Sequence, residues 1–195
     1  MRNIFLFLTC LQLSGQSKAL FKNDQIIELT LYGQINDVFK DRGESSSYHK
    51  ASVIHNLDGV KKEIPLKIKT RGNFRRSASN CKFPPLLLNF PKNKHPKNSL
   101  FYGQNKLKLV TSCKGENFVI QEYLVYRLYN LLTPYSFKAH LVNVTYKDAD
   151  KDEIINQSYG ILLENETNMA ARNEAVVLSK LHVNPQSIQR QEFLK

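Results

Sequence analysis

Apolar and polar residues alternate along several short segments, which is the pattern of β-strands that bury one face. Segments of this kind are residues 25–35, 64–69, 106–111, 138–148 and 157–166. Leu86–Leu88 is predicted to be a short buried strand, because the prolines around it limit its length. Asp58-Gly59 is a strong signal for a hairpin turn, and it precedes the strand at 64–69.

One longer segment has helical periodicity. Ile120, Leu124, Leu128 and Leu131 recur at the spacing of a single helix face, between Gly115 and Pro134. Two polar helical patterns follow, near 168–178 and 185–195. This order of elements predicts an α+β fold with a mostly antiparallel sheet, one long helix packed on it and helices at the C-terminus. Residues 18–195 are expected to form a single domain.

Residues 1–17 have the organisation of a secretory signal peptide. Arg2 supplies a positive charge, and residues 4–13 form an apolar stretch that is too short for a membrane span. No other segment is apolar enough to cross a bilayer. We therefore expect an exported protein that is not transmembrane. A buried N-terminal strand and a lipoprotein attached at Cys10 are the alternatives.

The two cysteines that follow this segment, Cys81 and Cys113, form an even pair. In an exported protein such a pair can form a disulfide, which would contribute roughly 3–4 kcal/mol through chain entropy. Two buried free thiols are the alternative. A metal site is not expected, because the cysteines and histidines lack ligand spacing. The acidic segment 148–152 also lacks the glycine that a calcium loop needs at its sixth position.

The formal net charge of +11 favours anionic partners. The lysines are spread along the chain, so a basic protein without an anionic partner is an equally open interpretation. A nucleic-acid partner is not expected, because the predicted signal peptide opposes it and no nucleic-acid-binding motif is present.

A group of charged residues could bind phosphate. The turn 71–76 contains Arg71, Arg75 and Arg76 around Gly72, and such a turn can surround an oxyanion with guanidinium groups and backbone N–H groups. A lysine on a strand, paired with a glutamate on the next helix, can fix an ammonium group over phosphates. Alternating lysines on a strand can also be no more than its solvated face.

The order of these segments resembles the spore-coat CotH kinase-like family, a group of atypical protein-kinase-like proteins. The similar segments are "KTRGNFRR", "CKFPPLLLNF", "NKLKLVTSCKGENFVIQEYLVYRLYNLL", "AHLVNVTY" and "SYGILLEN". Together they cover residues 66–168, about half of the chain. Phe74 departs from the family pattern, in which a serine commonly follows the Arg-Gly-Asn triplet.

The resemblance implies a kinase N-lobe that binds ATP with Mg²⁺ or Mn²⁺ and serves phosphoryl transfer to an exported protein substrate. The nucleotide-binding residues it implies are Arg71, Gly72, Asn73, Lys108, Glu122 and Glu164. Family members carry their catalytic residues C-terminal to these segments, and this chain stops at Lys195. We therefore expect a fragment that is inactive alone, with its catalytic residues unknown. The alternative is a non-catalytic exported module that binds an anionic or glycan ligand.

Overall fold

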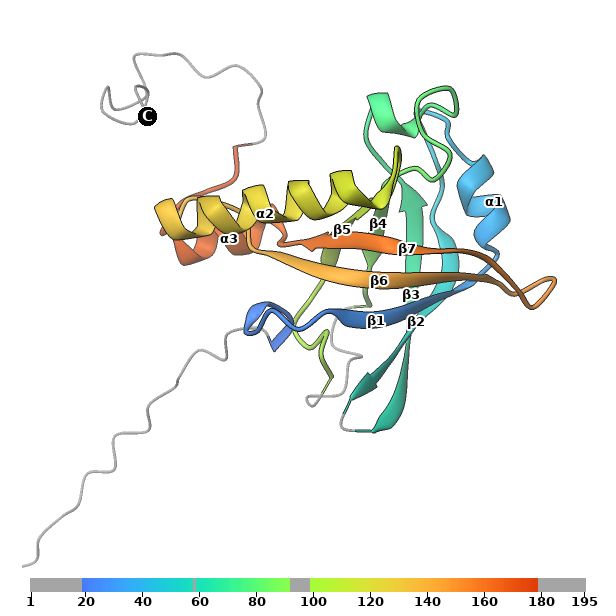
Figure 1. Cartoon of the computed structure of the whole chain (residues 1–195), viewed down its shortest axis with the longest axis horizontal. Helices are drawn as coiled ribbons and strands as arrows, with labels where there is room; N and C mark the ends of the chain where they lie inside the picture. Colours follow the sequence, from blue (N-terminus) through green and yellow to red (C-terminus); the bar gives the residue numbers. More distant parts are fainter. Residues whose placement is uncertain (1–18, 58, 92–98, 179–195) are drawn as a thin grey trace, which may run out of the picture.

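The computed structural model describes residues 19–57, 59–91 and 99–178, and its seven strands close into a barrel (Figure 1). The strands are β1 (Ile27–Gly33), β2 (His49–Leu57), β3 (Val60–Thr70), β4 (Leu86–Asn89), β5 (Lys106–Thr111), β6 (Ala139–Asp148) and β7 (Glu153–Leu163). They are arranged in the order β1-β2-β3-β4-β5-β7-β6. Parallel pairing of β1 with β6 closes this order, and each of the other pairs is antiparallel.

The expected α+β fold, with a kinase N-lobe sheet and one long packed helix, is therefore wrong. Local alternation identified most of the strands, but alternation cannot show which strands pair. The decisive pairing joins β1 to β6, from Ile27 opposite Val142 to Gly33 opposite Asp148. These strands are more than a hundred residues apart in the chain. Their pairing joins the two ends of the sheet into a barrel, which has no free edge there.

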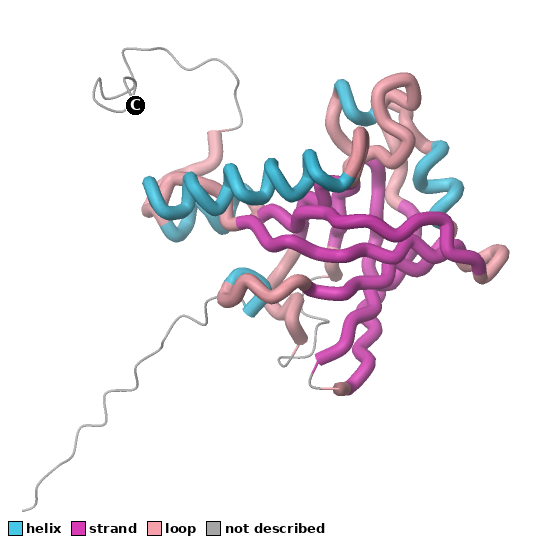
Figure 2. The backbone as a smooth tube through the Cα atoms, viewed as in Figure 1, coloured by secondary structure: helices cyan, strands magenta, loops and turns pink. Residues whose placement is uncertain are grey.

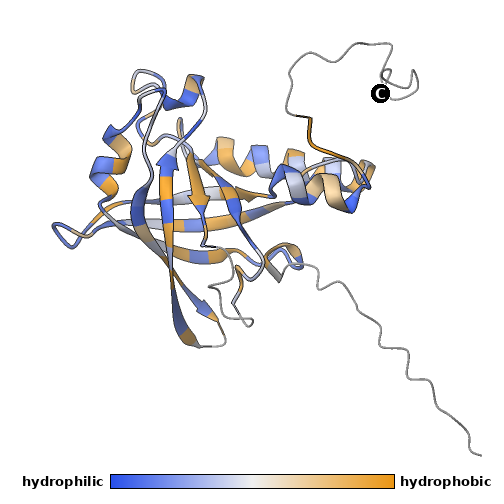
Figure 3. Ribbon diagram, turned by 180° about the vertical axis from the view of Figure 1, so that it is seen from behind, coloured by the Kyte–Doolittle hydropathy of each residue, from blue (hydrophilic) through white to orange (hydrophobic). Residues whose placement is uncertain are grey.

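The barrel interior is filled by the apolar residues of each alternating strand. On β3, Ile64, Leu66 and Ile68 are buried, whereas Pro65 and Lys67 between them are exposed. Figure 3 shows this alternation as successive hydrophobic and hydrophilic bands along the strands. At the hairpin between β2 and β3, Leu57 lies opposite Val60 and Gly59 has a φ of 77°. Asp58, the other residue of the predicted turn, lies outside the described residues.

Three α-helices lie outside the barrel in the described part of the chain (Figure 2). They are α1 (Ile35–Lys40), α2 (Glu116–Leu132) and α3 (Glu166–Arg172), and two short 3-10 turns, η1 (Ala19–Phe21) and η2 (Phe74–Arg76), accompany them. The pattern near 168–178 is helical only as far as Arg172, within α3. The second C-terminal pattern, at 185–195, lies outside the described residues.

Helix α2 forms where the periodicity predicts it, but it packs on the barrel through a different face. Val119 and Tyr123 are its buried side chains, against β6 and β7. Leu124 and Leu128 of the predicted face are 58% and 55% exposed. Because α2 carries apolar residues on more than one side, periodicity alone could not select the side that meets the sheet.

The predicted signal peptide at 1–17 and Cys10 also lie outside the described residues. Among the described residues, no helix combines the length and the apolar character that a membrane span requires.

Candidate functional site

A cavity of about 370 Å³ lies outside the barrel, where the end of β3, the turn η2 and helix α2 meet. Its walls are formed by Arg71, Gly72, Asn73, Phe74, Arg75, Pro85, Lys108, Val110, Glu122, Tyr126, Phe137 and Leu163. Five of the six residues that the resemblance implies for a nucleotide therefore line this one cavity: Arg71, Gly72, Asn73, Lys108 and Glu122.

The Arg-Gly-Asn turn begins where β3 ends. The backbone N–H of Arg71 donates to the carbonyl of Pro85 at 2.9 Å, which holds the start of the turn against the residue before β4. Gly72 then has a φ of 85°, a conformation that residues with a Cβ rarely adopt. This reversal leads directly into η2, so that Arg71 and Arg75 both line the cavity.

The guanidinium group of Arg71 is partly buried and carries no ion pair or side-chain hydrogen bond within the described part of the chain. Burial lowers the pKa of Arg71, while the negative charge of Glu166 opposes this shift. An arginine nevertheless stays protonated in proteins. The cavity therefore contains a permanent cation whose fork of donors is not used by any described carboxylate.

Lys108 lies on β5, opposite Leu87 of β4 and Leu163 of β7. Its Nζ is 3.1 Å from Oε2 of Glu166, at the start of α3, and 5.2 Å from the centre of the Phe137 ring. The pKa of Glu166 is lowered by a hydrogen bond from its own backbone N–H, and further by Lys108 and Arg71. Glu166 is therefore ionised at neutral pH beside both cations.

Glu122 of α2 pairs with Arg75, not with Lys108. Its Oε2 lies 3.1 Å from Nη2 of Arg75, and the two side chains are 30% and 41% exposed. The strand-lysine and helix-glutamate pair that the charge pattern suggested is thus replaced by two separate pairs. Sequence order could not assign the partners, because a long side chain takes whichever opposite charge it reaches.

Glu164, the sixth implied residue, does not line the cavity. It is 5% exposed, and its carboxylate accepts hydrogen bonds from Arg172 and from the backbone N–H of Lys138. Arg172 also donates to the carbonyl groups of Pro134 and Ser136. Glu164 therefore joins α3 to the segment between α2 and β6 in this structure.

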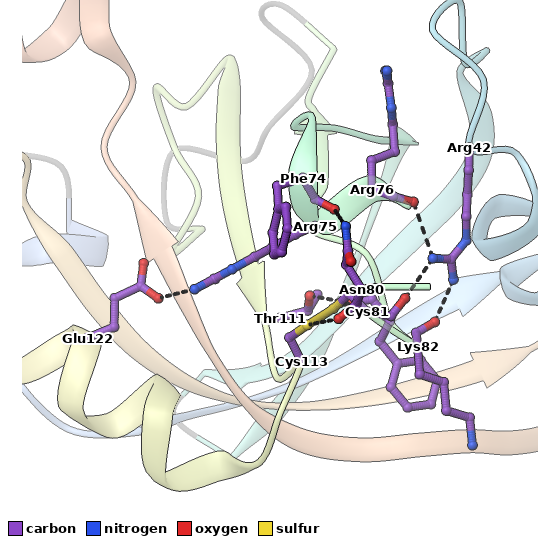
Figure 4. Close-up of a disulfide and its surroundings, with 11 residues drawn as sticks. Arg42, Phe74, Arg75, Arg76, Asn80, Cys81, Lys82, Thr111, Cys113 and Glu122 are labelled. Atoms are coloured by element: carbon purple, nitrogen blue, oxygen red, sulfur yellow. Dashed lines mark hydrogen bonds and ion pairs between the residues drawn. A yellow bond between two sulfur atoms is a disulfide. The ribbon is translucent and has the colours of Figure 1, made fainter. Parts of the chain in front are cut away.

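The turn that carries the arginines is fixed from two further sides (Figure 4). Cys81 forms a disulfide with Cys113, and their Cα atoms are 5.0 Å apart. This bond ties the segment that follows the turn to the segment between β5 and α2. From the same following segment, the Asn80 side chain donates to the carbonyl of Phe74 in the turn at 2.9 Å.

Arg42 is the third restraint on this turn, and no pattern in the sequence indicates it. From the segment after α1, its guanidinium donates to the carbonyl groups of Arg76, Cys81 and Lys82 at 3.3, 2.7 and 2.5 Å. It also donates to Phe39, at 2.6 Å. These partners are mostly far away in the chain, so no local pattern could have identified the contact.

The sequence matches no known protein family and none of the curated proteins.

A divalent cation does not fit the described residues by themselves. The described part of the chain holds no group of three or more histidine, cysteine or acidic side chains that could bind one. The acidic side chains beside the cavity, Glu122 and Glu166, are both engaged with cations. Three positive side chains thus meet two carboxylates, and the arrangement is suited to holding an anion.

Proposed function

We propose that this protein binds a phosphate-bearing ligand, with a nucleotide such as ATP as the first candidate, in the cavity lined by Arg71 and Lys108. The guanidinium of Arg71 carries the proposal. It is partly buried, it has no carboxylate partner among the described residues, and it faces the same cavity as a lysine. A guanidinium fork binds two phosphate oxygens at once, and the lysine adds a second positive charge.

Aromatic side chains around the cations support a nucleotide over free phosphate. Phe74, Tyr126 and Phe137 all line the cavity, and Phe74 is 67% exposed. Bases stack on aromatic rings of this kind, at about 1–3 kcal/mol for each base. The cavity therefore offers both a charged part for phosphates and an apolar part for a ring.

The wider assignment rests on the sequence. We propose kinship with the CotH kinase-like family and an exported location, which the Cys81–Cys113 disulfide supports because disulfides persist in oxidising compartments. Because a metal does not fit the described residues alone, we derive no phosphoryl-transfer step from this site. Transfer to a protein remains what the resemblance implies for a kinase-like protein.

Calorimetric titration of the purified chain with ATP tests the proposal. Arg71→Ala should weaken ATP binding about 10- to 100-fold, since a hydrogen bond to a charged group contributes about 1.5–3 kcal/mol. Arg76→Ala is the matched control, because Arg76 belongs to the same turn but does not line the cavity. It should leave the affinity within about twofold.

Two further ligands separate the parts of the site. Pyrophosphate should bind more weakly than ATP, and adenosine should bind least, since it lacks the charged groups that Arg71 and Lys108 would hold. Equal losses in Arg71→Ala and Arg76→Ala, or no binding of ATP or pyrophosphate at low salt, would refute a specific phosphate site here.

A further inference from the structure

A row of polar side chains crosses four neighbouring strands on the outer face of the barrel, at a place separate from the phosphate cavity. The register places Lys50 of β2 opposite Lys67 of β3, Lys67 opposite Asn89 of β4, and Asn89 opposite Lys106 of β5. We call these four residues the lysine row. Neighbouring strands are about 4.8 Å apart, so the row extends for about 14 Å.

The side chains of the row point outward. Lys50, Lys67 and Lys106 are exposed and Asn89 is half-buried. On either side of Lys67, the buried residues Leu66 and Ile68 point into the barrel. Side chains directly opposite one another in an antiparallel pair share a face, with their Cβ atoms about 5 Å apart.

The positive charge of the row has no partner within the described residues. Lys50, Lys67 and Lys106 form no ion pair or hydrogen bond with any described side chain. On the same face, the next lysines are compensated: Lys69 lies 5.0 Å from the centre of the Tyr48 ring, and Lys108 pairs with Glu166. Like charges directly opposite each other destabilise a sheet, so the Lys50–Lys67 pair opposes folding.

A cavity of about 740 Å³ lies over the row, within the range of small-ligand sites. Pro65 and Pro91 give it apolar walls, and Asn105 joins Asn89 as a second amide. Neither amide side chain forms a hydrogen bond with another described residue. The cavity thus combines ammonium groups, uncommitted amides and flat apolar surfaces.

We propose that this cavity binds a short anionic oligosaccharide, in which successive sugars carry carboxylate or sulfate groups. The ammonium groups of the row would hold the anionic groups at separate points along the ligand. The amides of Asn89 and Asn105 each offer a donor and an acceptor, as sugar hydroxyl groups require. The proline rings give the C–H faces of the sugars an apolar surface.

A bare polyanion would need only the lysines. The amides and the prolines distinguish a sugar chain from it, because they add hydrogen-bonding and apolar surface that a chain of phosphates does not use. This proposal is independent of the phosphate cavity, since none of the row residues lines that cavity.

Calorimetric titration at about 0.15 M ionic strength, where exposed charges are already screened, tests the proposal. The probes are tetragalacturonate and a heparin-derived hexasaccharide. Maltotetraose serves as a neutral sugar and tripolyphosphate as an anion without sugar. Binding of at least one anionic oligosaccharide, tighter than that of both controls, is the expected result.

Variants locate the binding. Lys67→Ala at the centre of the row should weaken oligosaccharide binding about tenfold, as the loss of a charge-assisted contact does. Lys61→Ala, an exposed lysine of the same strand outside the cavity, should have no effect. Asn89→Ala should weaken binding of the oligosaccharide and leave that of tripolyphosphate unchanged. Arg71→Ala should not change oligosaccharide binding.

The thermal unfolding of Lys67→Ala controls for misfolding. The variant should unfold at the same temperature as the native chain or a higher one, because one of two opposed charges is removed. The proposal is overturned if no anionic oligosaccharide binds or if Lys67→Ala and Lys61→Ala behave alike. It is also overturned if tripolyphosphate binds as tightly as the sugars and Asn89→Ala has no effect.

Discussion

Replacing Arg42 by alanine removes the side chain that holds the arginine-bearing turn in place through hydrogen bonds. Its guanidinium donates to carbonyl groups of Phe39, Arg76, Cys81 and Lys82. The contact to Arg76 is long, at 3.3 Å, whereas the other three lie between 2.5 and 2.7 Å. The three short hydrogen bonds are the ones whose loss should be measurable.

A net contribution of about 1 kcal/mol for each short bond is the centre of the range for typical hydrogen bonds. It lies below the range for bonds of charged groups, because the Arg42 side chain is partly exposed to solvent. Arg42→Ala should therefore lower the free energy of unfolding by about 3 kcal/mol, and the melting temperature by about 6–12 °C for a chain of this size. Arg42→Lys should recover only a small part, because an ammonium group cannot reach several carbonyls with the geometry of a guanidinium fork.

The turn is also held by the Cys81–Cys113 disulfide, so the two restraints should depend on each other. In a double-mutant cycle, Arg42→Ala is measured with the disulfide present and with both cysteines replaced by serine. We expect Arg42→Ala to weaken ATP binding more in the serine background. A coupling of about 1 kcal/mol is typical of residues that share one network.

Thermal unfolding and titration with ATP give the two readouts. The effects of Arg42→Ala and of the two serine replacements on ATP binding could be fully additive, and Arg42→Ala could leave the melting temperature unchanged. This result would show that the turn does not depend on these hydrogen bonds. Arg42 would then have no structural link to the phosphate cavity.

Two further predictions concern the barrel. Burial lowers the pKa of His140, whose Nε2 donates to the carbonyl of Gln25 at 2.8 Å. The folded state thus favours the neutral ring, so stability is full above the unfolded pKa of about 6.5 and falls as the pH drops below it. His140→Gln should flatten this fall in melting temperature between about pH 7 and 5.5. A methyl group on Gly160 would lie 3.0 Å from a side-chain carbon of Leu109 and from the carbonyl of Val110. Gly160→Ala should therefore cost about 1–3 kcal/mol in urea unfolding, whereas Gly43→Ala, with no atom within 4 Å, should cost little. Equal effects of the two glycine substitutions, or a steep pH dependence retained in His140→Gln, would contradict these interpretations.

The local elements follow from the sequence because their causes are local. Alternation along β3 and β5 reflects one buried and one solvated side of a strand, and this pattern extends over only a few residues. The position of α2 between Gly115 and Pro134 follows in the same way from periodicity and from helix-ending residues. Helix α1, by contrast, is only six residues long, too short for its periodicity to be read.

The candidate site could be found from the sequence only in part. The Arg-Gly-Asn turn and Lys108 stand out by residue type and order, and the structure brings them to one cavity. The partners of their charges could not be predicted, because Glu166 reaches Lys108 from another helix and Arg75 takes Glu122. The role of Arg42 could not be predicted, since its hydrogen bonds to the turn join residues 34 to 40 positions apart in the chain.

By itself, the sequence determined where most strands and the long helix lie. Only the tertiary structure decided that β1 pairs with β6 and closes the sheet into a barrel. It also decided that Lys50, Lys67 and Lys106 lie in one row across neighbouring strands. The physical reason is that backbone pairing is nearly independent of residue type. The register therefore depends on the packing of the whole barrel and not on any single segment.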